Sequence, residues 1–174
     1  GKMSELGAFL FGEKSFTMSD YLRKLFSAVM TLADTEPTIF VGRGTHLILP
    51  RDRVLAVRLI SSKEYRIQRV AAILGVSEND ARKELDAADK EQRRFFQKAF
   101  GKKDAPPDEF DLIIFDRYKR RGILPSIYLD NVRQYVEDGG AVLVAAGPDF
   151  ASADSIYRSP LADIIPAEPT ARVV

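Results

Sequence analysis

Hydrophobic positions along the first third of the chain alternate between helix-like and strand-like patterns. Residues 19–34 predict a helix capped by Ser19, because apolar residues recur there three or four positions apart. They form one face, made of Leu22, Leu25, Phe26, Val29 and Met30. Residues 38–42 and 54–60 are short β-branched runs bounded by Gly and Pro. These runs predict two buried strands.

Two further helices are predicted in the middle of the chain from their end signals. Residues 61–74 begin with Ser, end before Gly75 and carry apolar residues at helical spacing: Ile67, Val70, Ala71 and Leu74. Residues 77–101 open with a Ser77-to-Asp80 capping pattern and end at Gly101. This second stretch predicts a long, highly charged helix or a pair of helices.

The last third continues the alternation of strands and helices. A Pro-rich loop at 102–109 precedes a strand over 111–116, a helix over roughly 128–140 and a strand over 141–147. Only short structure is expected beyond residue 147. The alternation predicts an α/β fold with a mostly parallel sheet and helices on both faces, a three-layer sandwich. The length suits a single α/β domain over 1–174.

Composition narrows the classes of function. The chain has 26 Lys and Arg against 25 Asp and Glu, so no overall field attracts nucleic acid or a membrane surface. It has no cysteine and a single histidine, His46, so we expect no metal site. No apolar run reaches the roughly 20 residues of a membrane span, and no signal peptide is evident. We therefore expect a cytoplasmic protein without nucleic-acid or membrane partners.

One stretch near the start approximates a phosphate-binding loop. Residues 7–15 read GAFLFGEKS, close to G-x-x-x-x-G-K-S. The motif works because backbone N–H groups curl around phosphate, with Lys and Ser directly after the second Gly. Glu13 separates Gly12 from Lys14 here. We interpret the stretch as a surface turn.

Several ordered motifs between residues 40 and 69 resemble a known family. A strand ending in Gly-Arg is followed by T-x-x-x-x-P, a second strand and a helix with E-x-R-x-x-R. This order resembles the cytidylate kinase-like proteins among the P-loop nucleoside monophosphate kinases. The resemblance covers 1–114 and includes residues 89–101, DKEQRRFFQKAFG, which look like the mobile lid of that family.

The resemblance implies a phosphate or nucleotide site made of Arg43, Arg66, Arg69, Asp89, Arg93 and Arg94. Arg43 would hold the phosphate of a nucleoside monophosphate beyond the end of a strand, where open α/β sheets bind ligands. Arg66 and Arg69 lie near a helix N-terminus, which also favours anions.

The lid residues have implied roles of their own. Arg93 and Arg94 would close over the transferring phosphoryl group and stabilise its negative charge, while Asp89 would position them. Arg66 and Arg69 can also be the solvated edge of an amphipathic helix, and Arg93 and Arg94 an ordinary charged surface. For Arg43, the neighbouring Gly42 and Gly44 suggest close backbone approach. His46 is interpreted as a capping or packing residue rather than a base.

The main departure from the family is at the beginning of the chain. Family members start with a strand, a Gly-rich phosphate loop and a helix, which we expect to be missing here. Without that donor site the positioning that supplies most of the catalysis is lost. ATP and Mg²⁺ are therefore expected as cofactors only if the chain is a kinase after all.

The segment 110–174 resembles a different group, the glutamine amidotransferase-like domains with a flavodoxin-like sheet. The resemblance is carried by FDRY, YLDN, YVEDGGAVLVAAGP and S-x-Y-R-S-P-L. Amidotransferase chemistry needs a cysteine nucleophile and a histidine. The chain has no cysteine, and no histidine follows Leu47, so that chemistry is excluded. Both resemblances share the strand at 110–116, and we hypothesise that the chain is a chimera.

Two functions from different classes remain open. One is a catalytically inactive α/β module with residual affinity for a nucleotide or phosphate, which we favour; the other is a cytidylate kinase-like enzyme. The incomplete donor half also predicts a homodimer or a swapped oligomer, with the C-terminal segment as a possible exchanging arm. A basic loop can bind an anion or simply be solvated. It contains Arg117, Lys119, Arg120 and Arg121.

Overall fold

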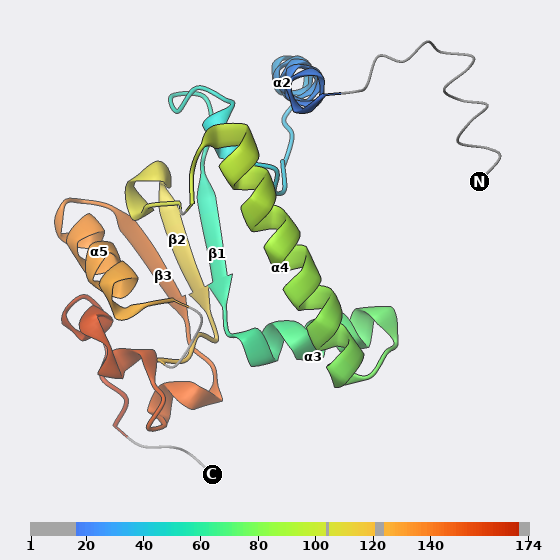
Figure 1. The fold of residues 1–174 in the computed structure, drawn as a ribbon. Coiled ribbons are helices and arrows are strands. Elements are labelled where there is room, and N and C mark those ends of the chain that lie inside the picture. The colour runs from blue at the N-terminus through green and yellow to red at the C-terminus, as the bar shows by residue number, and fades with distance from the viewer. Residues whose placement is uncertain (1–16, 104, 121–123, 171–174) are drawn as a thin grey trace.

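The computed structural model describes residues 17–103, 105–120 and 124–170. The helices and strands along this part of the chain are α2 (Met18–Thr35), β1 (Val57–Ser61), α3 (Lys63–Leu74), α4 (Glu78–Phe100), β2 (Leu112–Asp116), α5 (Ser126–Glu137) and β3 (Ala141–Ala145). Short 3₁₀ helices follow β3, as expected for the segment after residue 147. Figure 1 shows α5 on one side of the strands and α3 and α4 on the other.

The strands form one parallel sheet in the order β1-β2-β3. Each strand pairs with the next one along the chain, and helices make the connections between them. The predicted α/β class, with a parallel sheet and helices on both faces in a three-layer sandwich, is confirmed. The register places Ile60, Phe115 and Val144 in one row across the sheet. Neighbouring rows face opposite sides, because side chains alternate along a strand.

One face of the sheet is closed by a packed core. Ile113 and Phe115 of β2 are fully buried there against Leu129 and Val132 of α5 and the 3₁₀ segments after β3. Leu161, in the 3₁₀ helix η5 (Pro160–Asp163), is also fully buried. Burial of large apolar side chains of this kind is the dominant favourable contribution to folding.

The opposite face of the sheet is open. Leu59, Ile114 and Leu143 form one row there, and Leu59 and Leu143 are 68% and 51% exposed. The helices on that side, α3 and α4, pack mainly on each other through a small separate cluster: Ile67, Ala81 and Leu85. The two faces of a single sheet therefore differ sharply in packing.

The two middle helices begin and end where the sequence predicts. Ser62 and Ser77 cap α3 and α4 by accepting hydrogen bonds from the N–H groups of Tyr65 and Asp80. Gly75 and Gly101 end the helices with positive φ angles of 66° and 68°. Residues 78–100 form one continuous helix rather than a pair.

Three element boundaries differ from the expectation. Helix α2 is capped by Thr17 rather than Ser19, because Thr17 and Asp20 form a reciprocal capping box. Helix α5 begins at Ser126, directly after Pro125, rather than near residue 128. Strand β1 occupies only the second half of the predicted run at 54–60.

The predicted strand at 38–42 is wrong. These residues form no strand, and Ile39 and Val41 are 92% and 89% exposed. A strand is stabilised by the neighbour with which it pairs, and no described strand pairs with this segment. Among the described residues, no helix has the length and apolar character needed to cross a membrane.

Candidate functional site

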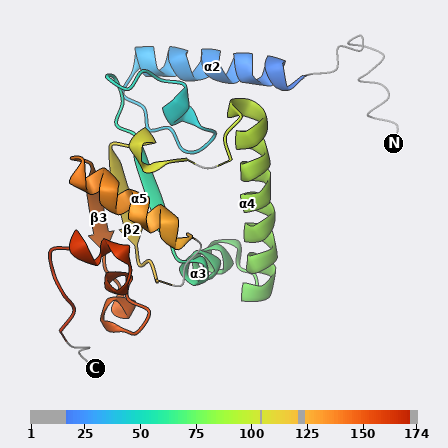
Figure 2. The same cartoon turned by 60° about the vertical axis from the view of Figure 1, so that its left-hand side comes forward.

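A large open cavity separates β1 from α4. Its volume is about 1460 Å³, and its walls come from the end of α2, residues 36–42 and 44–46, the whole of β1 and one side of α4. Figure 2 shows α2, α4 and α3 arranged around this side of the sheet. Three polar side chains contribute to the wall on the helical side: Arg66 of α3 and Asp89 and Gln92 of α4.

Arg43 lies at the rim of this cavity in an unusual backbone segment. Gly42, Arg43 and Gly44 have φ angles of 76°, 53° and 69°, three consecutive left-handed residues. A non-glycine residue in this region is uncommon and carries strain that the surrounding structure must hold. Gly44 is also required sterically, because a Cβ atom there would lie 2.4 Å from the ring of Phe100. Of the two glycines flanking Arg43, Gly44 therefore brings the backbone close to a neighbour, whereas the space at Gly42 is empty.

The Arg43 side chain turns toward α4 rather than into the cavity. Its guanidinium lies 5.3 Å from the centre of the Phe95 ring and 3.8 Å from Glu91 Oε1. Gly42 and Gly44 line the cavity, whereas Arg43 does not. Both members of the ion pair are more than half exposed, and such surface pairs contribute little. The guanidinium is therefore weakly held and can exchange partners at small cost.

Arg66 and Asp89 form the best-defined polar contact of the site. Arg66 donates two hydrogen bonds to the Asp89 carboxylate, of 3.0 Å and 2.6 Å. The parallel, two-pronged geometry is the strongest form of ion pair that arginine makes. It ties α3 to α4 and fixes the Arg66 guanidinium at the cavity wall. Asp89 thus contacts Arg66, and its predicted role in positioning the lid arginines stays a prediction.

The other predicted arginines lie away from the cavity wall. Arg69 is exposed on α3, and Arg93 and Arg94 are exposed on α4. None of the three lines the cavity. The structure therefore brings Arg66 and Asp89 together, with Arg43 at the rim, and leaves Arg69, Arg93 and Arg94 on the outer surface.

His46 lies inside the wall of the cavity. Its ring packs against Phe110 in a tilted arrangement, with 4.8 Å between the ring centroids, and stacks on Phe96 at 6.2 Å. Burial lowers the pKa of His46 below its usual 6.5, and the positive charges of Arg58, Lys102 and Arg51 lower it further. Its Nε2 atom has no hydrogen-bond partner and lies 3.6 Å from Glu109 Oε2. The side chain is packed as an aromatic ring, in line with the packing interpretation.

Comparison with protein families identifies the segment that forms most of this cavity. A model of the Cytidylate kinase-like family matches residues 2–116. The chain belongs to the cytidylate kinase-like family. Searches of curated proteins and of solved structures each found no match. The family match includes Arg43, the Arg66–Asp89 pair and the whole of α4, and it ends with β2.

The sequence analysis did not predict two of the residues with which this cytidylate kinase-like segment lines the cavity. Gln92 and Phe96 of α4 line the cavity beside Asp89. The three residues are three and four positions apart, which places them on one helix face. That spacing could have predicted a shared face for these residues, but the many charged residues around them made the face hard to recognise in the sequence. Glu91, the partner of Arg43, was also missed.

Two further expectations concern the phosphate-loop-like stretch and the absence of a metal site. The phosphate-loop-like stretch at 7–15 lies outside the described residues. Within the described ranges, no group of three or more His, Cys, Asp or Glu side chains could hold a metal ion.

Proposed function

We propose that the protein binds the phosphate group of a nucleoside monophosphate in the cavity between β1 and α4, without transferring a phosphoryl group. The observation that carries the proposal is Arg66, which two hydrogen bonds fix at the wall of a cavity inside the family-matched segment. A planar guanidinium held in this way suits the oxygens of a phosphate. The cavity volume exceeds the roughly 300–1,000 Å³ of typical small-molecule sites, so it has room for a nucleotide.

Arg43 supplies the second cation by exchanging its partner. Its contact with Glu91 is long and exposed, so a phosphate dianion entering beside Gly42 and Gly44 can replace the Glu91 carboxylate. When Arg43 and Arg66 approach the same phosphate, their two positive charges exceed the single negative charge of Asp89. The bound phosphate neutralises the remainder. The proposed lack of transfer rests on the sequence at 7–15, where Glu13 interrupts the phosphate-loop pattern.

A calorimetric titration with CMP tests the binding. The wild-type protein is expected to bind with 1:1 stoichiometry, and Arg43→Gln and Arg66→Gln to bind at least about tenfold more weakly. Glu91→Gln should bind more tightly, because it removes the competing carboxylate. Arg82→Gln, an exposed change on α4 outside the cavity, is the matched control. No CMP binding by the wild type, or equal affinity in all the variants, contradicts the proposal.

The kinase remains a second candidate because the family match is compatible with it. In that case ATP and Mg²⁺ would be bound as co-substrate and metal, and Arg43, Arg93 and Arg94 would contact the phosphates. A coupled assay with ATP, Mg²⁺ and CMP separates the two candidates. Turnover that Arg43→Ala abolishes would establish the kinase, whereas binding without turnover supports our proposal.

A second part of the proposal concerns the evolutionary or engineered origin of the C-terminal segment. Residues beyond 116 lie outside the family match, and β2 is the strand that both resemblances share. We infer that 110–174 derives from an amidotransferase-like domain and closes the sheet of the kinase-like segment, as a chimera. A gene family that carries both halves as one continuous domain would contradict this inference.

Self-association is the last part of the proposal. Large apolar side chains are exposed around β1, namely Ile39, Val41, Leu55 and Leu59, and no described strand pairs with the outer edge of β1. Their exposed area is on the order of several hundred Å², approaching the roughly 800 Å² per partner of a stable interface. A second copy of the chain is the proposed partner of this surface in the free protein. Because the same four side chains line the nucleotide cavity, CMP is expected to compete with self-association. Leu59→Lys should shift light scattering from dimer to monomer; a monomeric wild type at high concentration contradicts it.

A further inference from the structure

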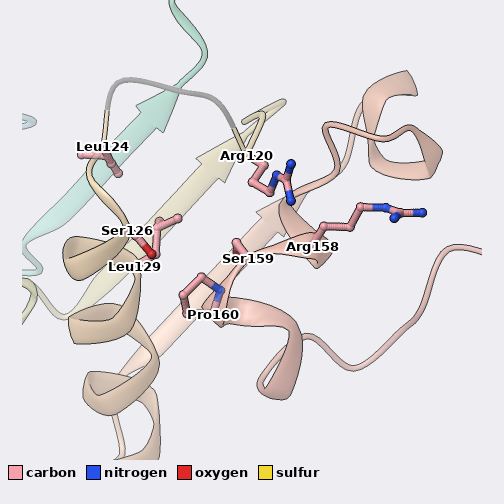
Figure 3. A pocket seen from close by; sticks show the side chains of 7 residues that line it. All are labelled: Arg120, Leu124, Ser126, Leu129, Arg158, Ser159 and Pro160. Atoms are coloured by element: carbon pink, nitrogen blue, oxygen red, sulfur yellow. The ribbon is translucent and has the colours of Figure 1, made fainter.

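A second, smaller cavity lies on the opposite half of the molecule, beyond the carboxyl end of β2. Its volume is about 240 Å³, and its lining comes from the loop after β2, the first turn of α5 and the segment around η4 (Ile156–Arg158). Figure 3 shows its lining: Arg120, Leu124, Ser126, Leu129, Arg158, Ser159 and Pro160. Ligands of open α/β sheets bind at this end of the strands.

The charge of this cavity has one sign. Two of its lining residues are arginines from segments 38 positions apart, Arg120 and Arg158, and none is a carboxylate. Ser126 and Ser159 also line it (Figure 3), and the Ser159 hydroxyl is bonded to the backbone, donating to the Ile156 carbonyl and accepting from the Leu161 N–H. The cavity opens at the start of α5, where the helix dipole adds to the positive potential.

The backbone fixes the two arginines relative to each other. Lys119 forms a bridge with Ser155, and the Arg120 N–H donates to the Asp154 carbonyl at 2.7 Å. The Arg158 N–H donates to the carbonyl of the same Ser155 at 3.0 Å. One short segment therefore anchors both arginine backbones, so binding needs little ordering of the backbone, and the ordering cost falls on the two exposed side chains.

The floor of the cavity is rigid. Leu129 is almost fully buried, and Ile156 and Leu161 pack in the same core cluster. Tyr118, also buried, accepts a hydrogen bond from the Leu124 N–H at 3.0 Å and so holds the far side of the loop. The arginine heads are exposed above this floor.

We propose that this cavity binds the phosphate group of a small molecule between Arg120 and Arg158, with Ser126 as an additional donor. The volume is below the roughly 300–1,000 Å³ of pockets that enclose whole drug-sized ligands, so only an anionic head group enters. Guanidinium groups match the oxygens of phosphate, and exposed charges give weak affinity that falls with salt. This site shares Leu124 with the lining of the proposed nucleotide cavity, but none of its proposed phosphate ligands lines that cavity, so the two proposals are independent.

Titration of the full chain with inorganic phosphate at constant ionic strength, followed by amide and arginine side-chain NMR signals, tests the proposal. Saturable shifts are expected at Arg120, Ser126 and Arg158, with a dissociation constant on the order of millimolar. Arg120→Gln and Arg158→Gln should each weaken binding at least about fivefold, and Ser126→Ala about twofold. Arg133→Gln, on the same helix outside the cavity, should bind as the wild type does.

Each contrary outcome overturns the assignment. Chemical shifts that grow linearly with phosphate concentration, without saturation, would indicate non-specific screening rather than binding at a site. Saturable shifts that survive both arginine variants place the anion elsewhere. An equal response to acetate at the same concentration removes the preference for phosphate.

Discussion

The two faces of one three-stranded sheet show how unequally this chain is packed. Beneath α5, Ile113 and Phe115 have no exposed surface, and the 3₁₀ segments after β3 complete a single core. On the other face Leu59 and Leu143 remain exposed, and a cavity of about 1460 Å³ separates β1 from α4. The closed half supplies stability, and the open half, which contains the family motifs, supplies the space for a ligand. Substitutions can test this division.

The largest expected difference is between two aliphatic residues of neighbouring strands. Ile113→Ala, in the closed core, should lower the free energy of unfolding by about 2–5 kcal/mol through lost burial and cavity formation. Leu59→Ala, on the open face, should change it by less than about 0.5 kcal/mol when the protein is too dilute to self-associate. Urea unfolding measures both. Similar losses for the two variants under these dilute conditions would mean that another part of the same chain covers the open face.

A second contrast lies within the glycine pair that flanks Arg43. Both glycines have positive φ, so alanine is strained at either position, by roughly 1–2 kcal/mol. Gly44→Ala should cost about 1 kcal/mol more than Gly42→Ala, because its Cβ meets the Phe100 ring whereas the space at Gly42 is empty. Thermal unfolding of the two variants compares them. Equal costs would show that Phe100 moves freely and that the rim is not fixed.

The third expected effect is a loss of stability when the Arg66–Asp89 ion pair between α3 and α4 is removed. Asp89→Asn removes a charge-assisted, two-pronged contact whose partners are mostly buried, and should destabilise the protein by about 1–2 kcal/mol. Asp86→Asn removes the more exposed pair with Lys63 between the same helices and serves as the control. It should cost clearly less. If the control costs as much, the Arg66–Asp89 pair is not the main tie between these helices.

The smallest effect is a pH dependence from His46. Its pKa is lowered in the folded state by burial first and then by Arg58, Lys102 and Arg51, while Glu109 is the acidic group that faces it. The unfolded chain therefore binds the proton more readily. Stability is complete above about pH 6.5 and falls as the pH drops below that value, by a fraction of the roughly 1.4 kcal/mol per pH unit that one proton supplies. His46→Gln should flatten this slope; an unchanged slope assigns it to other groups.

Local signals account for most of what the sequence predicts correctly. Helices α3 and α4 carry their caps in the sequence, Ser and Gly at fixed offsets, so their bounds follow from nearest neighbours alone. The segment 38–42 has strand composition but needs a neighbour to pair with, and composition cannot supply one. The nearer capping box at Thr17 displaced the predicted cap because Asp20 reciprocates its hydrogen bond.

The candidate site was predictable in its residue types but not in its geometry. Spacing placed Arg66 near a helix N-terminus, yet only folding shows that it meets Asp89, 23 positions away. The same limit applies to Arg43, which lies in a turn and whose partner Glu91 lies on α4. The arginines that stay on the surface have the same spacing and charge as those that do not, so the sequence cannot separate them.

Amide hydrogen exchange with and without CMP tests the division between the two halves most directly. The account predicts that residues 38–47 exchange fast in the free protein, that CMP slows exchange there and along α3 and α4, and that α5 and β2 are slow in both states. Uniform protection throughout the free protein, or protection by CMP confined to α5, would contradict it.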